Sequence, residues 1–299
     1  MNLNAQKSLA RSAENLNIRP LSDSEFALFQ TFILKRSGIY LSEAKKALLV
    51  GRLSRRIREL GLTSFGAYYR LHLWRRRGAS AIAHLICTNE THFFREPGQF
   101  EFLRQQIYPQ WIREAESRTR PRQIKVWSAA CSTGEEPYSI AMSLLSHFSP
   151  DRGWQIEILG TDLSTRVLEK ARNATWPLEK SKEIPNTYLK PFMLRGTGSK
   201  AGLMRAGPEI RSLIRFQHLN LNADSHEVSG NFDLIFCRNV MIYFNEETRR
   251  RTVTRLLTHL SPRGYFFLGH AESLNGVTDQ VRCVIPTVYS LSGVKKLRV

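Results

Sequence analysis

The stretch IKVWSAACSTGEEPY, residues 124–138, combines an apolar run, small residues, a glycine and two adjacent acids. This order is typical of a buried strand that turns sharply into a helix, as in nucleotide-binding loops. Glu135 and Glu136, however, stand where such a loop usually accepts a phosphate, and two carboxylates would repel that group. The pair therefore indicates a ligand without phosphate. Alternatively, the acids only complement the helix dipole, an effect worth roughly 0.3–1 kcal/mol.

A further acid, Asp162, ends the apolar run of WQIEILGTDLS, directly before a helical pattern. An ionised carboxylate only accepts hydrogen bonds, so this position suits the two hydroxyls of a ribose. A simple turn role for Asp162 fits the spacing equally well. S-adenosylmethionine carries a ribose, a cationic sulfonium and an ammonium group, but no phosphate. We therefore predict that Glu135 or Glu136 faces the ammonium group, with Gly134 allowing close approach of the backbone.

Strand-like and helical periods alternate after a predicted helix at about 97–117. This alternation predicts a doubly wound α/β fold with a mostly parallel sheet, with strands in IKVWSAA, WQIEILGTDLS, FDLIFCRNVMIYF, SPRGYFFLGHAES and CVIPTVYSLS. Ligands of such sheets bind beyond the carboxyl ends of the strands. Four segments would meet there: 127–137, 160–164, 218–222 and 236–243. A Gly, Pro and Arg-rich stretch at about 182–212 interrupts the alternation and predicts a small inserted subdomain.

The N-terminal part differs from this pattern. Residues 1–21 read as a disordered arm, and residues 22–86 as an all-helical domain whose first helix has Ser22 or Asp23 as N-cap and stops at Gly38. A second helix places apolar residues on one face, and its opposite face carries Arg52, Arg55, Arg56 and Arg58. Another basic cluster covers 75–77. Residues 87–96 form a connector to the α/β domain at 97–299.

Composition narrows the function further. The 299 residues carry a formal charge of +18, which implies an acidic partner such as nucleic acid, an anionic membrane surface or an acidic protein face. The four cysteines lie at wide intervals without ligand spacing, so we expect reduced, mostly buried thiols, no disulfides and no metal site. No apolar run suits a membrane span or a signal peptide, and we expect a soluble, unsecreted protein.

Several blocks occur in a fixed order: TNETHFFRE, VWSAACSTGEEPYSIAM, TDLSTRVLEKAR, RGTGSKAGLMR, and FDLIFCRNVMIYF with LGHAESL. Together they resemble the CheR family, the methyltransferases that esterify glutamates of bacterial chemoreceptors, over about residues 22–290. The resemblance implies a Rossmann-like class I methyltransferase domain with a small antiparallel β-subdomain, preceded by an all-helical domain. It also implies S-adenosylmethionine as cofactor and S-adenosylhomocysteine as product.

The resemblance assigns roles to individual residues. The connector would close over the cofactor, and Arg95 and Tyr243 would be the catalytic residues that hold the glutamate carboxylate in line with the methyl group. Before the resemblance is counted, an aromatic core position is the simpler interpretation of Tyr243. Glu136 matches the acidic position better than Glu135, and Asp162 matches the ribose-binding acid. The cofactor-binding residues implied are Asn89, Thr91, Arg95, Glu136, Asp162, Asn220, Leu221, Arg238 and Asn239.

Receptor docking is implied for two surfaces. The arginine face of Arg52, Arg55, Arg56 and Arg58 would meet acidic receptor helices, although charged faces are usually only solvated. The inserted subdomain resembles one that, in some members, binds a C-terminal receptor pentapeptide by adding a strand to a sheet edge. Its pattern falls on Arg195, Gly196, Thr197, Gly198, Gly202 and Arg205. The sequence leaves open whether this chain uses that tether.

Two other functions remain compatible with these residues: a methyltransferase acting on another substrate such as RNA, and a non-catalytic module that senses S-adenosylmethionine or docks on receptors. We expect no nucleic-acid partner. The sequence has no recognised RNA-binding module, and the loop after the fourth strand is not of the base-methylase type. The predicted partners are the cytoplasmic signalling domains of chemoreceptors. We expect a monomer without membrane insertion, located in the cytoplasm and recruited to receptor arrays.

Overall fold

The computed structural model describes residues 17–73 and 90–293, and the chain divides into two compact units. The N-terminal unit comprises Met1–Thr88 with Tyr243–Asn245, and the larger unit comprises Asn89–Ile242 with Glu246–Val299. Among the described residues, no helix has the length and apolar character needed to cross a bilayer. The predicted cluster at 75–77 and the cofactor residue Asn89 lie outside the described residues.

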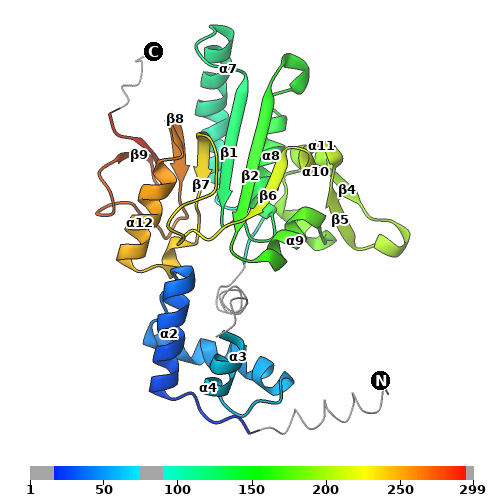
Figure 1. Cartoon of the computed structure of the whole chain (residues 1–299). Helices are drawn as coiled ribbons and strands as arrows, with labels where there is room; N and C mark the ends of the chain where they lie inside the picture. Colours follow the sequence, from blue (N-terminus) through cyan, green and yellow to red (C-terminus); the bar gives the residue numbers. More distant parts are fainter. Residues whose placement is uncertain (1–16, 74–89, 294–299) are drawn as a thin grey trace. The chain divides into compact units, whose positions relative to one another are not determined.

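The N-terminal unit is helical, as predicted (Figure 1). Helix α2, Asp23–Ser37, starts with a capping box in which the Ser22 hydroxyl accepts from the Glu25 amide and the Glu25 carboxylate accepts from the Ser22 amide. It ends at Gly38 in the left-handed conformation. A 3-10 turn, Glu43–Lys45, leads into α3, Lys46–Glu59, and a short helix α4, Phe65–Tyr68, continues into a π turn, Tyr69–Leu73. The apolar face of α3 buries Leu49, Leu53 and Ile57.

The larger unit is built on a seven-stranded sheet in the order β6-β2-β1-β7-β8-β10-β9 (Figure 1). Its strands are β1 Gln123–Ala129, β2 Gln155–Asp162, β6 Ile214–His218, β7 Phe232–Phe236, β8 Leu260–Phe267, β9 Val281–Ile285 and β10 Val288–Leu291. The strands from β6 to β8 are parallel to their neighbours, and β10 and β9 are antiparallel. The chain crosses from β6 back to β7, so the strand order reverses beside β1. The predicted doubly wound sheet is confirmed.

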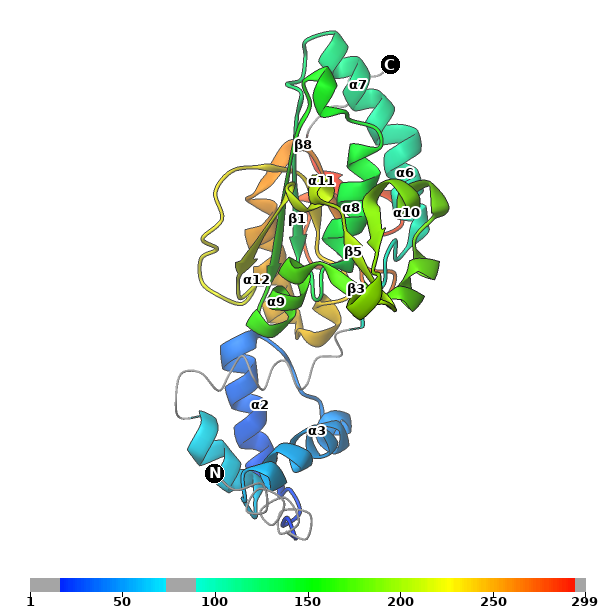
Figure 2. The same cartoon turned by 90° about the vertical axis from the view of Figure 1, so that its right-hand side faces the viewer.

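Helices cover both faces of this sheet (Figure 2). Helices α6 Pro97–Phe102, α7 Tyr108–Glu116 and α8 Glu135–Leu145 lie on one face, and α12 Glu246–Leu257 lies on the other. Helix α9, Thr165–Asn173, packs against β2 and β6. Between α6 and α7, residues Leu103–Ile107 form a π turn. Pro109 explains it, because proline lacks an N–H and its ring clashes with a carbonyl one turn earlier.

The sheet residues alternate between two apolar layers, as the period of a strand requires. Val126, Leu234 and Phe236 belong to one core cluster with residues of α6, α7 and α8. Trp127 and Ile235, which follow in the alternation, are fully buried too. Burial on both faces explains why these strands read as nearly continuous apolar runs in the sequence.

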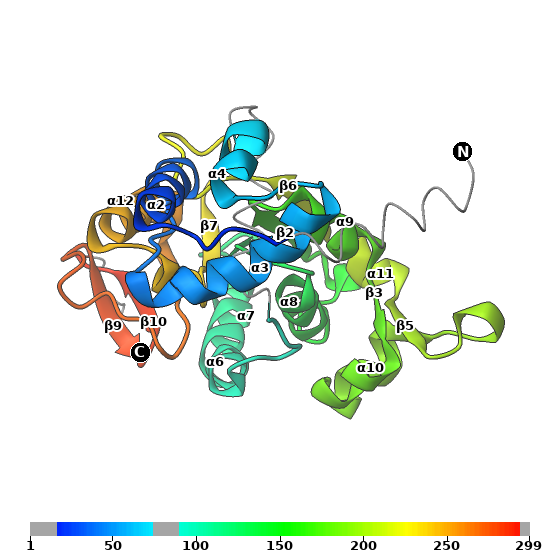
Figure 3. The ribbon, with the colours of Figure 1, turned by 90° about the horizontal axis from the view of Figure 1, so that it is seen from below.

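A second, three-stranded antiparallel sheet forms a separate lobe of this unit, in the order β3-β5-β4 (Figure 3). Its strands are β3 Thr175–Pro177, β4 Met193–Arg195 and β5 Leu203–Ala206. The connections contain 3-10 turns at Leu178–Glu183 and Gly198–Lys200 and the helices α10 Asn186–Phe192 and α11 Pro208–Arg211. This sheet begins before the predicted boundary of 182, because Trp176 pairs with Met204.

Two predicted strands differ in the structure. The stretch CVIPTVYSLS was predicted as one strand, but it forms parts of β9 and β10, a hairpin that turns at Pro286 and Thr287. Thr287 has a φ of 66°, which takes the chain out of the extended conformation. The strand predicted in FDLIFCRNVMIYF does not extend to Tyr243, because β7 stops at Phe236 and Tyr243 ends a 3-10 turn, Met241–Tyr243.

Candidate active site

The loop between β1 and α8 does not offer a phosphate cradle. Its Cys131 amide donates to the Thr161 carbonyl at 2.9 Å, and its Gly134 amide donates to the Cys131 carbonyl at 3.1 Å. The Ser132 amide donates to the Asp162 Oδ2 at 3.0 Å. Three backbone donors that a phosphate would use are therefore already bonded to the protein itself.

The backbone of this loop is tightly constrained. Ala130, Ser132 and Gly134 all have positive φ angles, of 65°, 49° and 97°. A Cβ atom on Gly134 would lie 3.0 Å from the Cβ of Ala171 in α9. The glycine therefore allows the loop to pack on α9, a structural reason that the sequence did not show.

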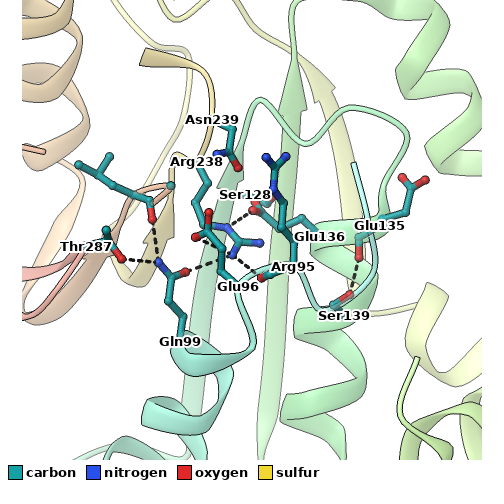
Figure 4. A network of polar contacts seen from close by, with 12 residues as sticks. Arg95, Glu96, Gln99, Ser128, Glu135, Glu136, Ser139, Arg238, Asn239 and Thr287 are labelled. Atoms are coloured by element: carbon teal, nitrogen blue, oxygen red, sulfur yellow. Dashed lines mark hydrogen bonds and ion pairs between the residues drawn. The ribbon is translucent and has the colours of Figure 1, made fainter. Parts of the chain in front are cut away.

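The two adjacent glutamates point to different partners (Figure 4). Glu135 is 1% exposed, and its carboxylate accepts from Lys180 Nζ at 2.9 Å and Thr133 Oγ1 at 2.6 Å. Glu136 is 9% exposed, and its carboxylate accepts from Ser128 Oγ and Arg238 Nε, both at 2.6 Å. Both acids thus do more than complement the helix dipole. Each forms an ion pair, Glu136 with the buried Arg238 and Glu135 with the partly exposed Lys180.

Arg238 connects the loop to the segment before α6 (Figure 4). Its side chain is 2% exposed, and its Nη1 donates to the Arg95 carbonyl at 2.7 Å and to Gln99 Oε1 at 3.1 Å. The same nitrogen lies 3.4 Å from Glu96 Oε2. Glu96 and Glu136 therefore share one buried guanidinium, so two buried carboxylates depend on a single buried cation.

The thiol of Cys131 lies inside the loop, near the carboxylates of Asp162 and Glu136. Burial, and then the charges of Asp162 and Glu136, raise the pKa of this thiol well above its usual value. Cys131 and Cys237 are buried, Cys283 is exposed, and Cys87 lies outside the described residues. A cationic ligand near this loop would be favoured by these carboxylates.

Asp162 ends β2 with its carboxylate at the same edge of the sheet. Its Oδ1 accepts from the Ser164 amide at 2.9 Å and its Oδ2 from the Ser132 amide at 3.0 Å, so it also has the turn role considered from the sequence. Burial raises the pKa of this carboxyl despite the two bonds. Because an ionised carboxylate has about four acceptor sites, Asp162 can also accept from a ligand hydroxyl. The nearby Ser132 hydroxyl is buried and has no hydrogen-bond partner within the described part of the chain.

The segment after β6 is held by α12. The Asn220 side chain accepts from the Asn222 amide at 3.0 Å, and the Leu221 carbonyl accepts from Thr252 Oγ1 at 3.4 Å. Arg251 donates to Asn222 Oδ1 at 2.5 Å, and Arg255 donates to the carbonyl of the residue that follows. Two arginines of α12 therefore help to fix the segment that carries Asn220 and Leu221.

The segment that follows β7 is held by the carboxylate of Glu272. Asn239 has a φ of 57°, and its amide donates to Glu272 Oε2 at 2.8 Å, while the Met241 amide donates to Oε1 at 2.8 Å. These bonds replace the strand ladder, which explains why Tyr243 is not on a strand. Tyr243 belongs to the N-terminal unit, where its carbonyl accepts from the Tyr40 amide at 2.7 Å.

The connector residues Thr91 and Arg95 also lie in the larger unit. The Thr91 carbonyl accepts from Lys180 Nζ at 2.8 Å, and an Arg95 guanidinium nitrogen donates to the Glu90 carbonyl at 3.2 Å. The structure thus gathers Arg95, Glu136, Arg238 and Asn239 in one cluster (Figure 4). Sequence reasoning missed Glu96, Gln99, Lys180 and Glu272. Of these, Glu96 and Glu272 had a signal, because they stand in the blocks TNETHFFRE and LGHAESL.

The predicted docking residues lie on two surfaces. Arg52, Arg55, Arg56 and Arg58 are all exposed on α3, and Arg55 and Arg56 share the carboxylate of Glu59 at 3.0 and 3.2 Å. Arg195 lies on β4, Arg205 on β5, and Gly196, Thr197, Gly198 and Gly202 in the connection between these strands. A Cβ on Gly196 would come within 2.1 Å of the Lys200 carbonyl oxygen, so this tight turn requires glycine.

Comparison with known proteins gives the family. A profile described as the CheR methyltransferase SAM-binding domain matches residues 89–290, and one described as the CheR all-alpha domain matches residues 24–71. The chain is 41% identical over 270 residues to chemotaxis protein methyltransferase 2 of Pseudomonas aeruginosa, covering 89% of this chain and 92% of that protein. It is 38% identical over 275 residues to the chemotaxis protein methyltransferase of Escherichia coli, covering 91% and 92%. The chain therefore belongs to the CheR family of S-adenosylmethionine-dependent methyltransferases.

Proposed function

We propose that this methyltransferase transfers a methyl group from S-adenosylmethionine to glutamate side chains of bacterial chemoreceptors and forms glutamyl methyl esters. The names of the relatives, chemotaxis protein methyltransferases, support the substrate class. The main structural support is that two buried carboxylates share Arg238, beside a loop with backbone amides that are already hydrogen-bonded within the protein. This arrangement suits a cationic cofactor that has no phosphate.

The cofactor residues are proposed on the same basis. When bound, S-adenosylmethionine supplies a methyl group on a positively charged sulfur. Asp162 would accept from the ribose hydroxyls, and Glu136 would face the ammonium group, since the Glu135 carboxylate is more deeply buried and paired with Lys180. Asn220 and Leu221 would border the adenine. Thr91, Arg95, Arg238 and Asn239 would complete the site, with Asn89.

The chemistry places few demands on the protein. A glutamate side chain has a pKa near 4.3 and is already an ionised oxygen nucleophile at neutral pH, so no general base is needed. Catalysis then depends on alignment, which can contribute on the order of 7–11 kcal/mol. We assign Arg95 and Tyr243 to hold the incoming carboxylate in line with the methyl group.

Receptor binding is proposed on two surfaces. The exposed arginines of α3 suit acidic receptor helices, and the net charge of +18 supports electrostatic docking. Strand β4 is an edge strand of the small sheet, and its Leu194 is 56% exposed. An unpaired edge of this kind can accept a receptor peptide as an additional strand. The protein would act as a monomer in the cytoplasm, at membrane-bound receptor arrays.

A methylation assay tests the function. The protein is incubated with radiolabelled S-adenosylmethionine and either receptor cytoplasmic fragments or total RNA, and the products are treated with mild alkali. Carboxyl methyl esters release volatile methanol, whereas methyl groups on bases or ribose remain. We expect alkali-labile label in the receptor and none after Arg95→Ala. Label confined to RNA would support the RNA alternative, and cofactor binding without any transfer would support a non-catalytic module.

A further inference from the structure

The connector segment before α6 has a backbone that local sequence does not favour. Phe94 has a φ of 50° and Glu96 a φ of 63°, both in the left-handed region. Non-glycine residues keep this conformation only when surrounding contacts hold them there. The contacts of Thr91, Phe93 and Phe94 therefore show what fixes the segment.

Polar contacts from one short turn hold the connector backbone. Lys180 Nζ donates to the Thr91 carbonyl at 2.8 Å and to Glu135 Oε1 at 2.9 Å. Glu183 Oε2 accepts from the Phe93 amide at 2.9 Å. Lys180 and Glu183 lie in the 3-10 turn Leu178–Glu183, which directly follows β3 of the small sheet. The Lys180 side chain is 25% exposed, so water competes only partly for these bonds.

Aromatic contacts reinforce the same connection. The Phe93 ring meets Trp176 of β3 edge-to-face, with ring centroids 5.0 Å apart. The Phe94 ring stacks on Tyr188 of α10 at 4.8 Å. A third polar contact joins His92 Nδ1 to Glu183 Oε1 at 3.4 Å, so three polar and two aromatic contacts from the inserted subdomain act on the segment that ends at Arg95. Outside the subdomain, the Phe94 amide donates to Ser139 Oγ of α8, and the Arg95 carbonyl accepts from Arg238 Nη1.

We propose that the inserted subdomain positions the cofactor-contacting connector, with Lys180 as the central positioning residue. Lys180 joins the Thr91 carbonyl to the first turn of α8 through Glu135, so it sets the spacing between two parts of the cofactor site. This inference rests on the proposed function in that Thr91 and Arg95 contact the cofactor. It gives the subdomain a role in cofactor binding that is separate from receptor tethering. By linkage, a receptor peptide that shifts the turn would alter cofactor affinity, and cofactor would alter peptide affinity equally.

Replacing Lys180 by methionine tests this role. Lys180→Met keeps the apolar stem but removes the donor, and we expect the dissociation constant for S-adenosylhomocysteine, measured by calorimetry, to rise about tenfold. The KM for S-adenosylmethionine should rise similarly, while the KM for the receptor fragment stays unchanged. Lys180→Arg should recover most of the affinity. Lys182→Met is the matched control, because Lys182 is exposed in the same turn and carries the same charge.

Hydrogen exchange of the protein without cofactor gives an independent readout. In Lys180→Met the amides of residues 91–94 should exchange faster, with α12 unaffected. Glu183→Gln, compared with Glu179→Gln at an exposed position of the same turn, should produce a smaller change in the same direction. These milder variants provide the test if Lys180→Met does not fold.

The outcomes separate this inference from the proposed function. Unchanged cofactor affinity and unchanged exchange in folded Lys180 and Glu183 variants would overturn the positioning role, even if the wild-type protein methylates receptors. Weaker cofactor binding and faster exchange support the positioning role, even if receptor fragments are not methylated. In that case the positioning role would hold, and only the proposed substrate would be wrong.

Discussion

Arg238→Met should lower the free energy of unfolding of the larger unit by about 3–5 kcal/mol, the range for breaking a buried ion pair from one side. The guanidinium is 2% exposed and bonds Glu136 at 2.6 Å and the Arg95 carbonyl at 2.7 Å, with Glu96 at 3.4 Å. Methionine can fill most of the space of the aliphatic stem. It leaves two buried carboxylates without their cation, and this uncompensated charge dominates the expected loss.

A double variant separates the cost of this charge from the cost of lost packing. In Arg238→Met with Glu136→Gln, one of the two unpaired carboxylates becomes a neutral amide. We expect this change to restore about 1–3 kcal/mol, the usual penalty of a buried unsatisfied polar group. The order of stability should therefore be wild type, double variant, single variant. Packing loss alone would instead make the double variant no more stable than the single one.

Urea unfolding followed by tryptophan fluorescence measures these differences, because this unit buries Trp111, Trp127, Trp154 and Trp176. Arg250→Met on α12 is the control. Arg250 is exposed and pairs with Glu246 one turn away at 3.1 Å, so its replacement should cost less than about 0.5 kcal/mol. A loss below about 1 kcal/mol for Arg238→Met would refute the view that Glu96 and Glu136 depend on it.

Three further predictions follow from the site and the docking surface. Gly134→Ala should destabilise the protein by about 1–3 kcal/mol in the same urea assay, because the residue has a φ of 97° and a methyl group would press on Ala171; an unchanged midpoint would contradict the packing explanation. Asp162 is proposed to accept from both ribose hydroxyls, which requires the ionised carboxylate, so binding of S-adenosylhomocysteine should weaken as the pH falls. Burial raises the pKa of Asp162, so calorimetry from about pH 7 to about pH 4 should show the loss beginning above the pH expected for an ordinary aspartate, and Asp162→Asn should bind more weakly without this step. The double variant Arg55→Glu, Arg56→Glu should slow receptor methylation more at low salt than at high salt. A loss of methylation rate that does not depend on salt would argue against electrostatic docking.

Local sequence patterns predicted the parts of this fold that depend on neighbouring residues. The N-cap at Ser22, one of the two predicted candidates, the stop at Gly38 and the loop from β1 into α8 each follow from residue types within a few positions. The end of β7 and the β9–β10 hairpin could not be predicted from local sequence patterns. The exit from β7 depends on the Glu272 carboxylate, which lies 33 positions beyond Asn239.

Local sequence patterns could not predict the partners of Glu135 and Glu136. Lys180 follows Glu135 by 45 positions, and Arg238 follows Glu136 by 102. Nothing in the spacing or periodicity of either cation distinguishes it from the many basic residues of this chain. The sequence could therefore place acid at the loop, but it could not show how much of that acid is already neutralised.

The pairing of Glu135 and Glu136 explains why two acids occur side by side at this loop. Successive residues in the first turn of a helix point about 100° apart, so one position faces the inserted subdomain and the next faces the end of β7. Glu135 pairs with Lys180 and joins the loop to the subdomain, whereas Glu136 must share the buried Arg238 with Glu96. Under the proposed function, positioning and recognition of the cofactor charge would thus fall on different residues. Glu135→Gln should consequently act through the connector and resemble Lys180→Met in hydrogen exchange, while Glu136→Gln should weaken cofactor binding without loosening residues 91–94. Identical exchange patterns in both variants would show that the division does not hold.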